Sequence, residues 1–429
     1  MTGMKKKMIM AILILMNGLA GFSQVTIEEC QRRAQEHYPL VRQYVQIEEA
    51  EAYRLANAGK GYLPQMRLSG SASYRSDVTR LPIDVSQWGI PGIDIPTLSK
   101  DQYGLSFDMV QMLWDGGEIK SGKERVRTAA QVEKEHVGVG LYALYKQVNR
   151  VFFGILLADA GLQQNKLLQE ELAQNYQRVQ ACVQHGIAEE TDLHVVRVEQ
   201  LKAEQHATEL TRARTACIAI LANLTGMAIN ETTDFVRPVA NTPLTLSVNR
   251  PELSLYDAQI RNYEAENSHI TAELFPKFAL FATGGYGKPG LNMLENTFAP
   301  YYIVGMKFEW NISHFYTLKN RRKLIRNRIG QTVLQRELFL FNTRLDMIRE
   351  NKEVERYTEQ LKYDDGIIRL KTAIRKASEV KVTNGILSVR ELMRDLHAEQ
   401  MAIQDKISHE IAYLQALYDL KFTIGHTNE

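Results

Sequence analysis

The chain has 429 residues, 45% of them apolar, and a formal net charge of +2. These values allow a large buried core, and the nearly balanced charge does not indicate binding to nucleic acid or to another polyanion. Its three cysteines, an odd number, argue against a disulfide framework in an oxidising compartment. We expect Cys30, Cys182 and Cys217 to be buried apolar residues.

The first 23 residues are typical of a secretory signal peptide. The basic run Lys5–Lys7 precedes the apolar residues 8–16, and small residues follow at Gly21 and Ser23. We expect cleavage after about Ser23. A retained membrane anchor is the alternative, but the apolar run is too short to span a bilayer well. Because Cys30 lies within a predicted helix and not at the cleavage site, lipidation there is not expected.

The first half of the chain begins with one predicted helix and two predicted strands. Thr26 and Glu29 have the spacing of a helix-capping box, and a break is expected near Pro39. Between Pro64 and Tyr74 apolar and polar residues alternate, which predicts a strand with one apolar and one polar face. In chain order the elements are a helix, a strand, a polar loop and a second strand, at 26–61, 64–74, 76–101 and 104–113.

Two much longer helical segments follow. The helical pattern of residues 117–184 corresponds to roughly 100 Å of α-helix, and after a turn at Gly186 a returning helix covers 190–226. Apolar residues recur at spacings of four and three, as in a coiled coil. The first helix carries Leu144, Val148, Val151, Ile155, Ala158, Leu162, Leu172, Tyr176, Val179 and Val183 in this seam, and the second carries Leu210, Ala213, Cys217, Ile220 and Leu224.

The same order of elements then occurs a second time. Pro64 and Pro276 lie 212 positions apart, as do Pro39 and Pro251. The second half has strands at 278–287 and 302–312, helices at 317–384 and 387–423, and a turn at Gly385. Its long helix repeats the seam at Leu334, Leu338, Phe341, Leu345 and Ile348, and its last helix at Ile407, Ile411, Leu414 and Tyr418. The predicted division is a signal peptide (1–23), a first structural repeat (24–226), an equatorial linker (227–250) and a second repeat (251–429).

The strands predict an oligomer. Four strands cannot close a barrel, and an open sheet edge in lipid would leave backbone N–H and C=O groups unpaired at several kcal/mol each. Closure needs further chains related by rotation. Two chains would give eight strands with a filled bore, and three would give twelve with room for a channel. The apolar faces, suited to contact with lipid, carry Met66, Leu68, Phe107, Phe278, Leu280, Phe308 and Trp310.

Other features of the strands fit a membrane channel. The opposite faces carry small residues, including Ser69, Ser71, Ser73, Gly285 and Gly287, which suit a water-filled pore. Aromatic belts at the membrane interfaces are expected to contain Tyr74, Tyr286, Tyr301 and Tyr302. A basic cluster after the fourth strand is either a solvated helix face or a contact with anionic head groups; it comprises Lys319, Arg321, Arg322, Lys323, Arg326 and Arg328.

The order, spacing and duplication of short segments resemble the TolC-type outer-membrane efflux protein family. The segments are those around Pro39 and Pro251, then Gly61–Gln65, Trp114–Gly117, Gly186–Leu193 and Gly385–Leu392, and the resemblance covers essentially the whole mature chain. It implies an α+β membrane protein in which a trimer closes a 12-stranded barrel in the outer membrane. The long coiled-coil helices would form a periplasmic tunnel.

The resemblance also implies a function and partners. The chain would be the channel of a tripartite efflux or type I secretion system that exports small molecules or peptides. It would dock to a periplasmic adaptor (membrane fusion) protein and to an inner-membrane pump of RND or ABC type, without a cofactor or metal. The adaptor-docking positions would be the two helix turns, at Gly186, Ile187, Gly385 and Ile386.

A gate is expected where the helices turn. Family members often carry two acidic residues after the second turn, which form rings at the constriction. Here Glu391 stands at the first of these positions, but Arg394 replaces the second, with Asp395 beside it. Glu391 and Arg394 are spaced to face each other on one helix, either as a latch between chains or as an ordinary surface pair. Asp192, in the first repeat, is the alternative gate position.

An enzyme and a periplasmic scaffold are the two alternative classes of protein. An enzyme is not favoured, because the sequence has no zinc-protease, phosphate-loop or nucleophile-elbow motif; the pair Asp364-Asp365 is expected on a solvated helix face. The stronger alternative is an exported periplasmic coiled-coil adaptor or scaffold without a barrel. Such a protein would share the long helices and the signal, but it would not need two pairs of strands with apolar faces.

Overall fold

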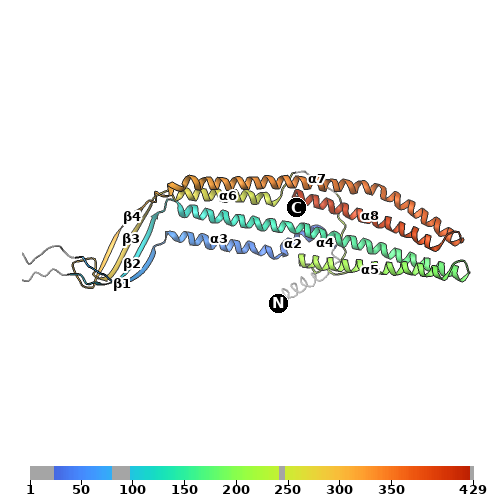
Figure 1. Ribbon diagram of the computed structural model, residues 1–429, viewed down its shortest axis with the longest axis horizontal. Coiled ribbons are helices and arrows are strands. Elements are labelled where there is room, and N and C mark those ends of the chain that lie inside the picture. The colour runs from blue at the N-terminus through green and yellow to red at the C-terminus, as the bar shows by residue number, and fades with distance from the viewer. Residues whose placement is uncertain (1–23, 80–96, 241–246, 426–429) are drawn as a thin grey trace, which may run out of the picture. The chain divides into compact units, whose positions relative to one another are not determined.

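The computed structural model describes residues 24–79, 97–240 and 247–425 (Figure 1). The predicted signal peptide and the middle of the first polar loop lie outside these residues. The helices are α2 (Ile27–His37), α3 (Gln43–Gly59), α4 (Glu118–Gln184), α5 (Glu190–Thr225), α6 (Pro251–Ala272), α7 (His314–Thr383) and α8 (Val389–Ile424), with short 3-10 helices η1 (Pro39–Arg42) and η2 (Lys60–Tyr62). The strands are β1 (Gln65–Tyr74), β2 (Asp101–Trp114), β3 (Lys277–Lys288) and β4 (Ala299–Glu309).

These bounds confirm the predicted order of elements. The break expected near Pro39 separates α2 from α3 through η1. Thr26 caps α2, since its hydroxyl accepts a hydrogen bond from the Glu29 N–H at 3.3 Å. The expected return bond from the Glu29 side chain is replaced by ion pairs with Arg32 and Arg33 at 2.6 and 2.9 Å. A charged acceptor beside two guanidinium groups forms stronger bonds there than with a neutral N–H.

The chain forms two compact units. The sheet unit comprises residues 44–135 and 255–335, and the helical unit comprises the remaining described residues. Each unit takes segments from both halves of the chain. The division therefore follows the fold and cuts across the sequence repeat.

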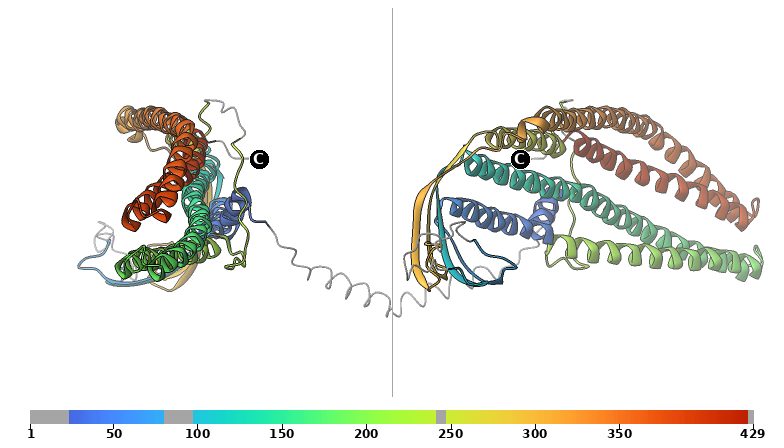
Figure 2. Two further views of the ribbon diagram at one scale, coloured as in Figure 1. Left: turned by 90° about the vertical axis from the view of Figure 1, so that its right-hand side faces the viewer. Right: turned by 60° about the vertical axis from the view of Figure 1, so that its left-hand side comes forward.

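The sheet unit contains one antiparallel sheet with the strand order β1-β2-β3-β4. The helical segments of this unit follow the order of the strands that they adjoin. Both figures show α3 beside α4 and α6 beside α7 (Figure 1, Figure 2). Lys134 on α4 lies 3.4 Å from Glu51 on α3, and the Thr128 hydroxyl donates to the Asn262 side chain on α6 at 2.9 Å. Arg328 on α7 pairs with a carboxylate of α6 at 3.3 Å. Strands and helices thus form one continuous layer.

The basic cluster at the start of α7 contributes to this layer. Arg321 pairs with Glu273 at 2.6 Å, and Arg322 donates to the Thr271 hydroxyl at 3.1 Å. Arg321, Arg322 and Arg328, half of the basic cluster, therefore hold α7 against the α6 side of the layer. This use leaves fewer cations for lipid head groups than the sequence suggested.

The core of the helical unit forms where α2, α4, α5 and α8 meet. Phe152 and Phe153 are its largest fully buried side chains, and the Phe153 ring contacts Tyr418 on α8 with a centroid separation of 5.5 Å. Phe235, from the predicted linker, packs on Phe152 and forms a parallel bridge with Val25. The core comprises Val25, Ile27, Cys30, Ala34, Val148, Val151, Phe152, Phe153, Ile155, Leu156, Ile218, Leu221, Leu224, Phe235, Ile411, Leu414 and Tyr418.

Several predictions of burial need correction. On α5, Ile220 and Ala213 are exposed, and Ile218 and Leu221 are buried instead. A straight helix of 3.6 residues per turn drifts away from a strict seven-residue repeat, so the seam shifts by one residue along α5. Cys30 is buried as expected, whereas the other two cysteines are half-buried.

The predicted solvated pair Asp364-Asp365 is also different in the structure. Asp364 is buried on α7, where its carboxylate lies 2.9 Å from the imidazole Nδ1 of His409 on α8. Asp365 is exposed and pairs with Lys406 at 2.6 Å. The sequence pattern could not show this, because His409 lies 45 residues away on another helix.

Candidate functional site

The strand register places the apolar residues on one side of the sheet. Leu68 pairs with Phe107, Phe107 with Gly284, and Gly284 with Tyr302, so one row crosses all four strands. We call this side the apolar face. It carries Met66, Leu68, Leu105, Phe107, Phe278, Leu280, Tyr286, Tyr302, Val304, Met306 and Phe308, which are 36–80% exposed. Soluble monomers rarely leave so large an apolar patch in water.

Trp310, expected on the same face, lies one residue beyond the end of β4. Its indole N–H donates to the backbone oxygen of Leu274 at 2.9 Å. The alternation of the sequence continues past Glu309, but the ladder with β3 ends there. Trp310 therefore belongs to the junction between strand and helix.

The opposite side, which we call the polar face, is linked by hydrogen bonds between side chains. The hydroxyls of Ser69 and Ser106 lie 2.9 Å apart on β1 and β2. The Thr283 hydroxyl of β3 donates to Asp108 at 2.7 Å, and the Ser106 hydroxyl donates to the same carboxylate at 3.4 Å. A face of this chemistry suits contact with water.

Aromatic rings occupy two glycine positions on the polar face. The ring of Tyr301 covers Gly285, and the ring of Phe281 covers Gly305, so that a Cβ at either glycine would overlap a ring. Tyr301 and its neighbour Tyr302 thus point to opposite faces. Tyr301 cannot join the belt expected on the apolar face, and Gly285 is not open lining.

Aromatic side chains gather at both ends of the apolar face. At the helix end, Phe278 contacts Phe308 and Trp114 with centroid separations of 5.2 and 5.9 Å. At the loop end, Phe298 stacks on Tyr286 at 5.7 Å. Phe278 and Tyr286 are eight residues apart on β3, about 26 Å along the strand. Barrels in the outer membrane have an apolar band of similar height between two aromatic girdles.

Both edges of the layer are unpaired within the described residues. β1 forms a ladder only with β2, and β4 only with β3. Beside β1, the helix α3 has no buried residue at all. The predicted seam of α7 is 50–64% exposed in the single chain; we call it the α7 stripe, and it comprises Leu334, Leu338, Phe341, Leu345 and Ile348.

The two hairpin turns of the helical unit have the same geometry. Gly186 and Gly385 adopt φ angles of +72° and +68°, in the left-handed region that favours glycine. The N–H of Ile187 bonds to the oxygen of Cys182 at 2.8 Å, and the glycine N–H bonds to Val183 at 3.0 Å. The second turn has the same two bonds, which satisfy the last carbonyls of the helix as in a Schellman motif.

Each turn leads directly into a capped helix. Glu189 and Ser388 are N-caps of α5 and α8, and in both cases the third helical residue completes a capping box. Ile187 and Ile386, immediately after the turn glycines, are exposed. The turns therefore present apolar side chains on a backbone that is held by hydrogen bonds.

The gate candidates are partly used in these caps. Glu391 accepts hydrogen bonds from the Ser388 N–H at 3.2 Å and hydroxyl at 2.9 Å, and these bonds lower the pKa of its carboxyl. Asp192 accepts the corresponding bond from the Glu189 N–H at 3.2 Å. Arg394 is exposed and lies 3.8 Å from Asp395.

Asp395 itself accepts a hydrogen bond from the Ser378 hydroxyl on α7 at 2.6 Å, which joins the two arms of the second hairpin. Of the four candidates, the three carboxylates thus have partners within the chain. The exposed Arg394 is the side chain best placed to reach another copy.

A charge cluster that the sequence analysis missed links α4, α7 and α8. Arg375 lies 2.7 Å from Glu171 and 3.0 Å from Glu379, and it also pairs with Glu399. Arg178 pairs with Glu379 at 3.1 Å. Burial raises the pKa of Glu171, although Arg375 opposes the shift. Only the i,i+4 spacing of Arg375 and Glu379 could have indicated this cluster in the sequence.

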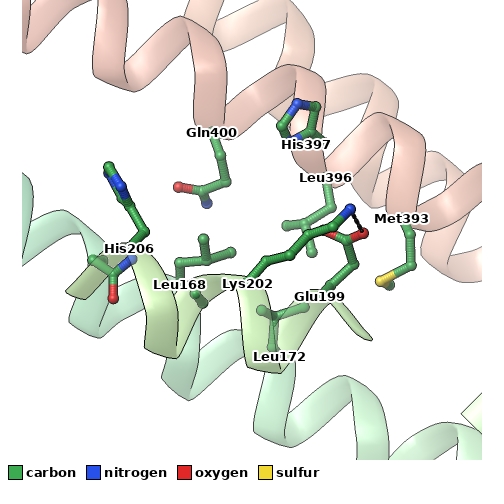
Figure 3. Close-up of a pocket in the computed structure, with 11 residues that line it drawn as sticks. Leu168, Leu172, Glu199, Lys202, His206, Met393, Leu396, His397 and Gln400 are labelled. Atoms are coloured by element: carbon green, nitrogen blue, oxygen red, sulfur yellow. Dashed lines mark hydrogen bonds and ion pairs between the residues drawn. The ribbon is translucent and has the colours of Figure 1, made fainter. Parts of the chain in front are cut away.

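A hollow of about 190 Å³ lies between α4, α5 and α8 near the hairpin turns (Figure 3). Leu168, Leu172 and Leu396 supply its apolar lining. Figure 3 shows His206 and the Lys202–Glu199 pair on one side, with His397 and Gln400 on the other. Gln164 of α4 donates to Gln400 of α8 at 2.9 Å, so a direct bond joins the two hairpins beside the hollow.

Metal sites and membrane-spanning helices are both absent from the described residues. These residues contain no cluster of three or more His, Cys, Asp or Glu side chains that could hold a metal ion. No helix in residues 24–79, 97–240 or 247–425 has both the length and the apolar content needed to cross a membrane. The Cys30 thiol is buried among apolar residues, which raises its pKa to about 12.

The fold is similar to that of solved outer-membrane channels. The channel OprN aligns over 94% of this chain and 91% of its own length, with a TM-score of 0.70 and 13% identity. CusC, which undergoes conformational changes that accompany folding and transmembrane channel formation, aligns over 94% of this chain and 92% of its own length with a TM-score of 0.68 and 15% identity. The outer membrane protein VceC of Vibrio cholerae aligns over 94% and 97% with a TM-score of 0.68 and 10% identity. No protein-family model matches the sequence, and no curated protein matches it.

Proposed function

We propose that this chain, whose fold is that of the TolC-type outer-membrane efflux channels, is the outer-membrane channel of a tripartite efflux or type I secretion system. The proposal rests on the sheet, which has an exposed apolar face, a hydrogen-bonded polar face and two open edges. In lipid the open edges must be paired. The chain then acts as a conduit, and not as an enzyme.

Three copies close the barrel. The β4 edge of one chain pairs with the β1 edge of the next, which gives twelve strands with the polar face toward a water-filled lumen. The exposed α7 stripe and α3, which has no buried residue, supply further apolar and open surface for contact between chains at the level of the helices. The homotrimer contacts outer-membrane lipid through the apolar face, and its helices form a periplasmic tunnel.

The periplasmic end binds the partners. Ile187 and Ile386 are exposed apolar side chains on hydrogen-bonded turns, which suits docking of a periplasmic adaptor protein. The adaptor would connect the trimer to an inner-membrane pump of RND or ABC type. The exported molecules would be small compounds or peptides that pass along the tunnel. Arg394 and Glu391, near the second turn, are the proposed gate, with Asp192 as the alternative position.

The experiment that tests the barrel uses two neighbouring residues of β4. Val304 is on the apolar face and Ile303 is on the polar face. An arginine facing lipid near the bilayer midplane costs roughly 2–4 kcal/mol, so V304R should reduce the folded, heat-modifiable trimer on a gel. I303R, which points to the lumen, should assemble. L280R and S71R make the same comparison on β3 and β1, and equal behaviour within each pair would contradict the face assignment.

Fractionation separates this function from the periplasmic adaptor or scaffold. A barrel stays in the membrane pellet after a carbonate wash, because its apolar face is buried in lipid. An adaptor without a membrane anchor is released. Recovery of the protein in the soluble wash would therefore favour the alternative.

A further inference from the structure

The loop between β3 and β4 is unusually apolar. We call residues 289–298 the apolar loop. Glu295 is its only charged residue, and Leu291, Met293, Leu294 and Phe298 are 50–63% exposed. Four large apolar side chains exposed in ten residues form a patch that calls for a partner.

Hydrogen bonds hold this loop in a defined conformation. The Asn292 side chain accepts from the Leu294 N–H at 3.0 Å, and its backbone oxygen accepts from the Glu295 N–H at 3.3 Å. The Asn296 side chain accepts from the Ser99 N–H, just before β2, at 3.0 Å. The loop is therefore attached on the β2 side and bends away from the open β4 edge, where another chain would join.

The base of the loop lies over the apolar face of the sheet. Phe298 stacks on Tyr103 and Tyr286, with centroid separations of 6.2 and 5.7 Å and interplanar angles of 27° and 14°. Both tyrosines are on the apolar face, since Tyr103 pairs with Ala72 and Tyr286 with Leu105. The loop thus continues the surface that the proposed function places in lipid, and does not fold over the lumen.

We propose that the apolar loop inserts Leu291, Met293 and Leu294 among the acyl chains of the outer leaflet and so extends the lipid contact of the barrel beyond its strands. This inference rests on the proposed outer-membrane function. Lipid is the occupant that fits best, because the loop is nearly uncharged, continues the apolar face and bends away from the joint between chains.

A spin label at position 293 tests the proposal on the full-length trimer in phospholipid vesicles. C30S, C182S and C217S remove the native thiols, and M293C then carries the label. Collision rates with oxygen, which concentrates in lipid, are compared with those of a water-soluble nickel chelate. We expect the ratio of oxygen to nickel accessibility at 293 to be several-fold higher than for a label at S71C on the polar face. L294C is a second labelling site if M293C does not assemble.

The reference label at L280C, on the apolar face, separates the two levels of inference. If the label at position 280 is in lipid and the label at position 293 is open to the nickel chelate, the loop stays in water. The proposal for the loop is then wrong, whereas the proposed barrel is still supported. If 293 is shielded from both reagents, the loop packs on protein and the proposal is again wrong. If 280 itself is open to the chelate, the outer-membrane function fails with it.

Discussion

Single residues decide the two hairpin turns, because both depend on a left-handed glycine. Nothing lies within 4 Å of a Cβ at Gly186, so G186A tests the backbone conformation alone. An L-residue in this region costs about 1–2 kcal/mol. Gly366 lies inside α7 with equally open surroundings, and G366A should instead gain about 0.4–1 kcal/mol. Thermal melting of the helices, followed by circular dichroism at 222 nm, should shift in opposite directions.

A melting shift of the same sign for both variants would contradict this account of the turn. The comparison also bears on docking, because the glycine sets the direction of the exposed Ile187. A G186A protein that melts earlier should also bind the proposed adaptor more weakly. Binding can be measured by co-purification of the two proteins.

Arg394 and Glu391 provide a test of the gate. If the two side chains alternate between chains and hold the tunnel shut, both R394A and E391Q should raise the closed-state conductance of the trimer in a planar bilayer. E391Q keeps an acceptor for the Ser388 cap, so it removes charge without removing the capping box. The double variant should add less than the sum of the two effects. Unchanged conductance in both single variants would move the gate toward Asp192.

The same latch should depend on pH in a defined direction. Hydrogen bonds from Ser388 lower the pKa of Glu391 below its ordinary value of 4.5. The carboxylate is therefore charged at neutral pH, and its contribution is lost only as the pH falls through the lowered pKa. Conductance of the native trimer should stay constant from pH 7 to 5 and rise below 4.5, whereas E391Q should lack this rise.

At the scale of helices, the Arg375 cluster joins α4, α7 and α8 and should be costly to break. R375M leaves three carboxylates without their common partner, and removing one member of a buried ion pair typically costs about 3–5 kcal/mol. The control is R356M on the same helix, where the pair with Glu353 is exposed and worth at most about 1 kcal/mol. Urea unfolding of the helical signal measures both. Equal losses of unfolding free energy in R375M and R356M would show that water screens the charges of the cluster.

Within this cluster, Glu171 should change the stability of the fold with pH in the direction opposite to that of a typical ion-paired acid. Burial raises its pKa, and the neighbouring Glu399 and Glu379 add to the shift while Arg375 opposes it. The folded state therefore binds this proton more tightly than the unfolded state does, so the stability it contributes is present below pH 4.5 and is lost as the pH rises through the raised pKa. Above pH 4.5 the free energy of unfolding should therefore depend less on pH in E171Q than in the native protein. Urea titrations at several pH values measure this.

The sequence predicted most of the elements because their signals are local. The heptad spacing located α4 and α7, the alternation located the four strands, and Gly186 and Gly385 located the turns. The errors concern contacts between distant segments. The end of β4 depends on its ladder with β3, and the burial of Asp364 depends on His409. The gate candidates are predicted from their positions after the two turns, whereas their hydrogen-bond partners depend on the fold.

For the whole molecule, the main question is what covers the α7 stripe. Within one chain α4 buries most of its predicted seam, whereas the stripe on α7 is largely exposed. A heptad seam without a partner indicates a helix from another copy. Fully burying one leucine contributes about 1.5–3 kcal/mol, and a threefold assembly repeats each such contact three times.

The stripe therefore predicts how to separate the proposed trimer without changing the sheet. L338R and L345R together place two charges in the joint between chains, and the expected product is a folded monomer, because the core residues Phe152 and Phe153 are untouched. L338M keeps the apolar contact and should stay trimeric. Light scattering of the detergent-solubilised protein gives the mass of each, and circular dichroism confirms the helices. A trimer that survives both arginines would mean that strand pairing between β4 and β1 alone holds the chains together and that the stripe faces the tunnel.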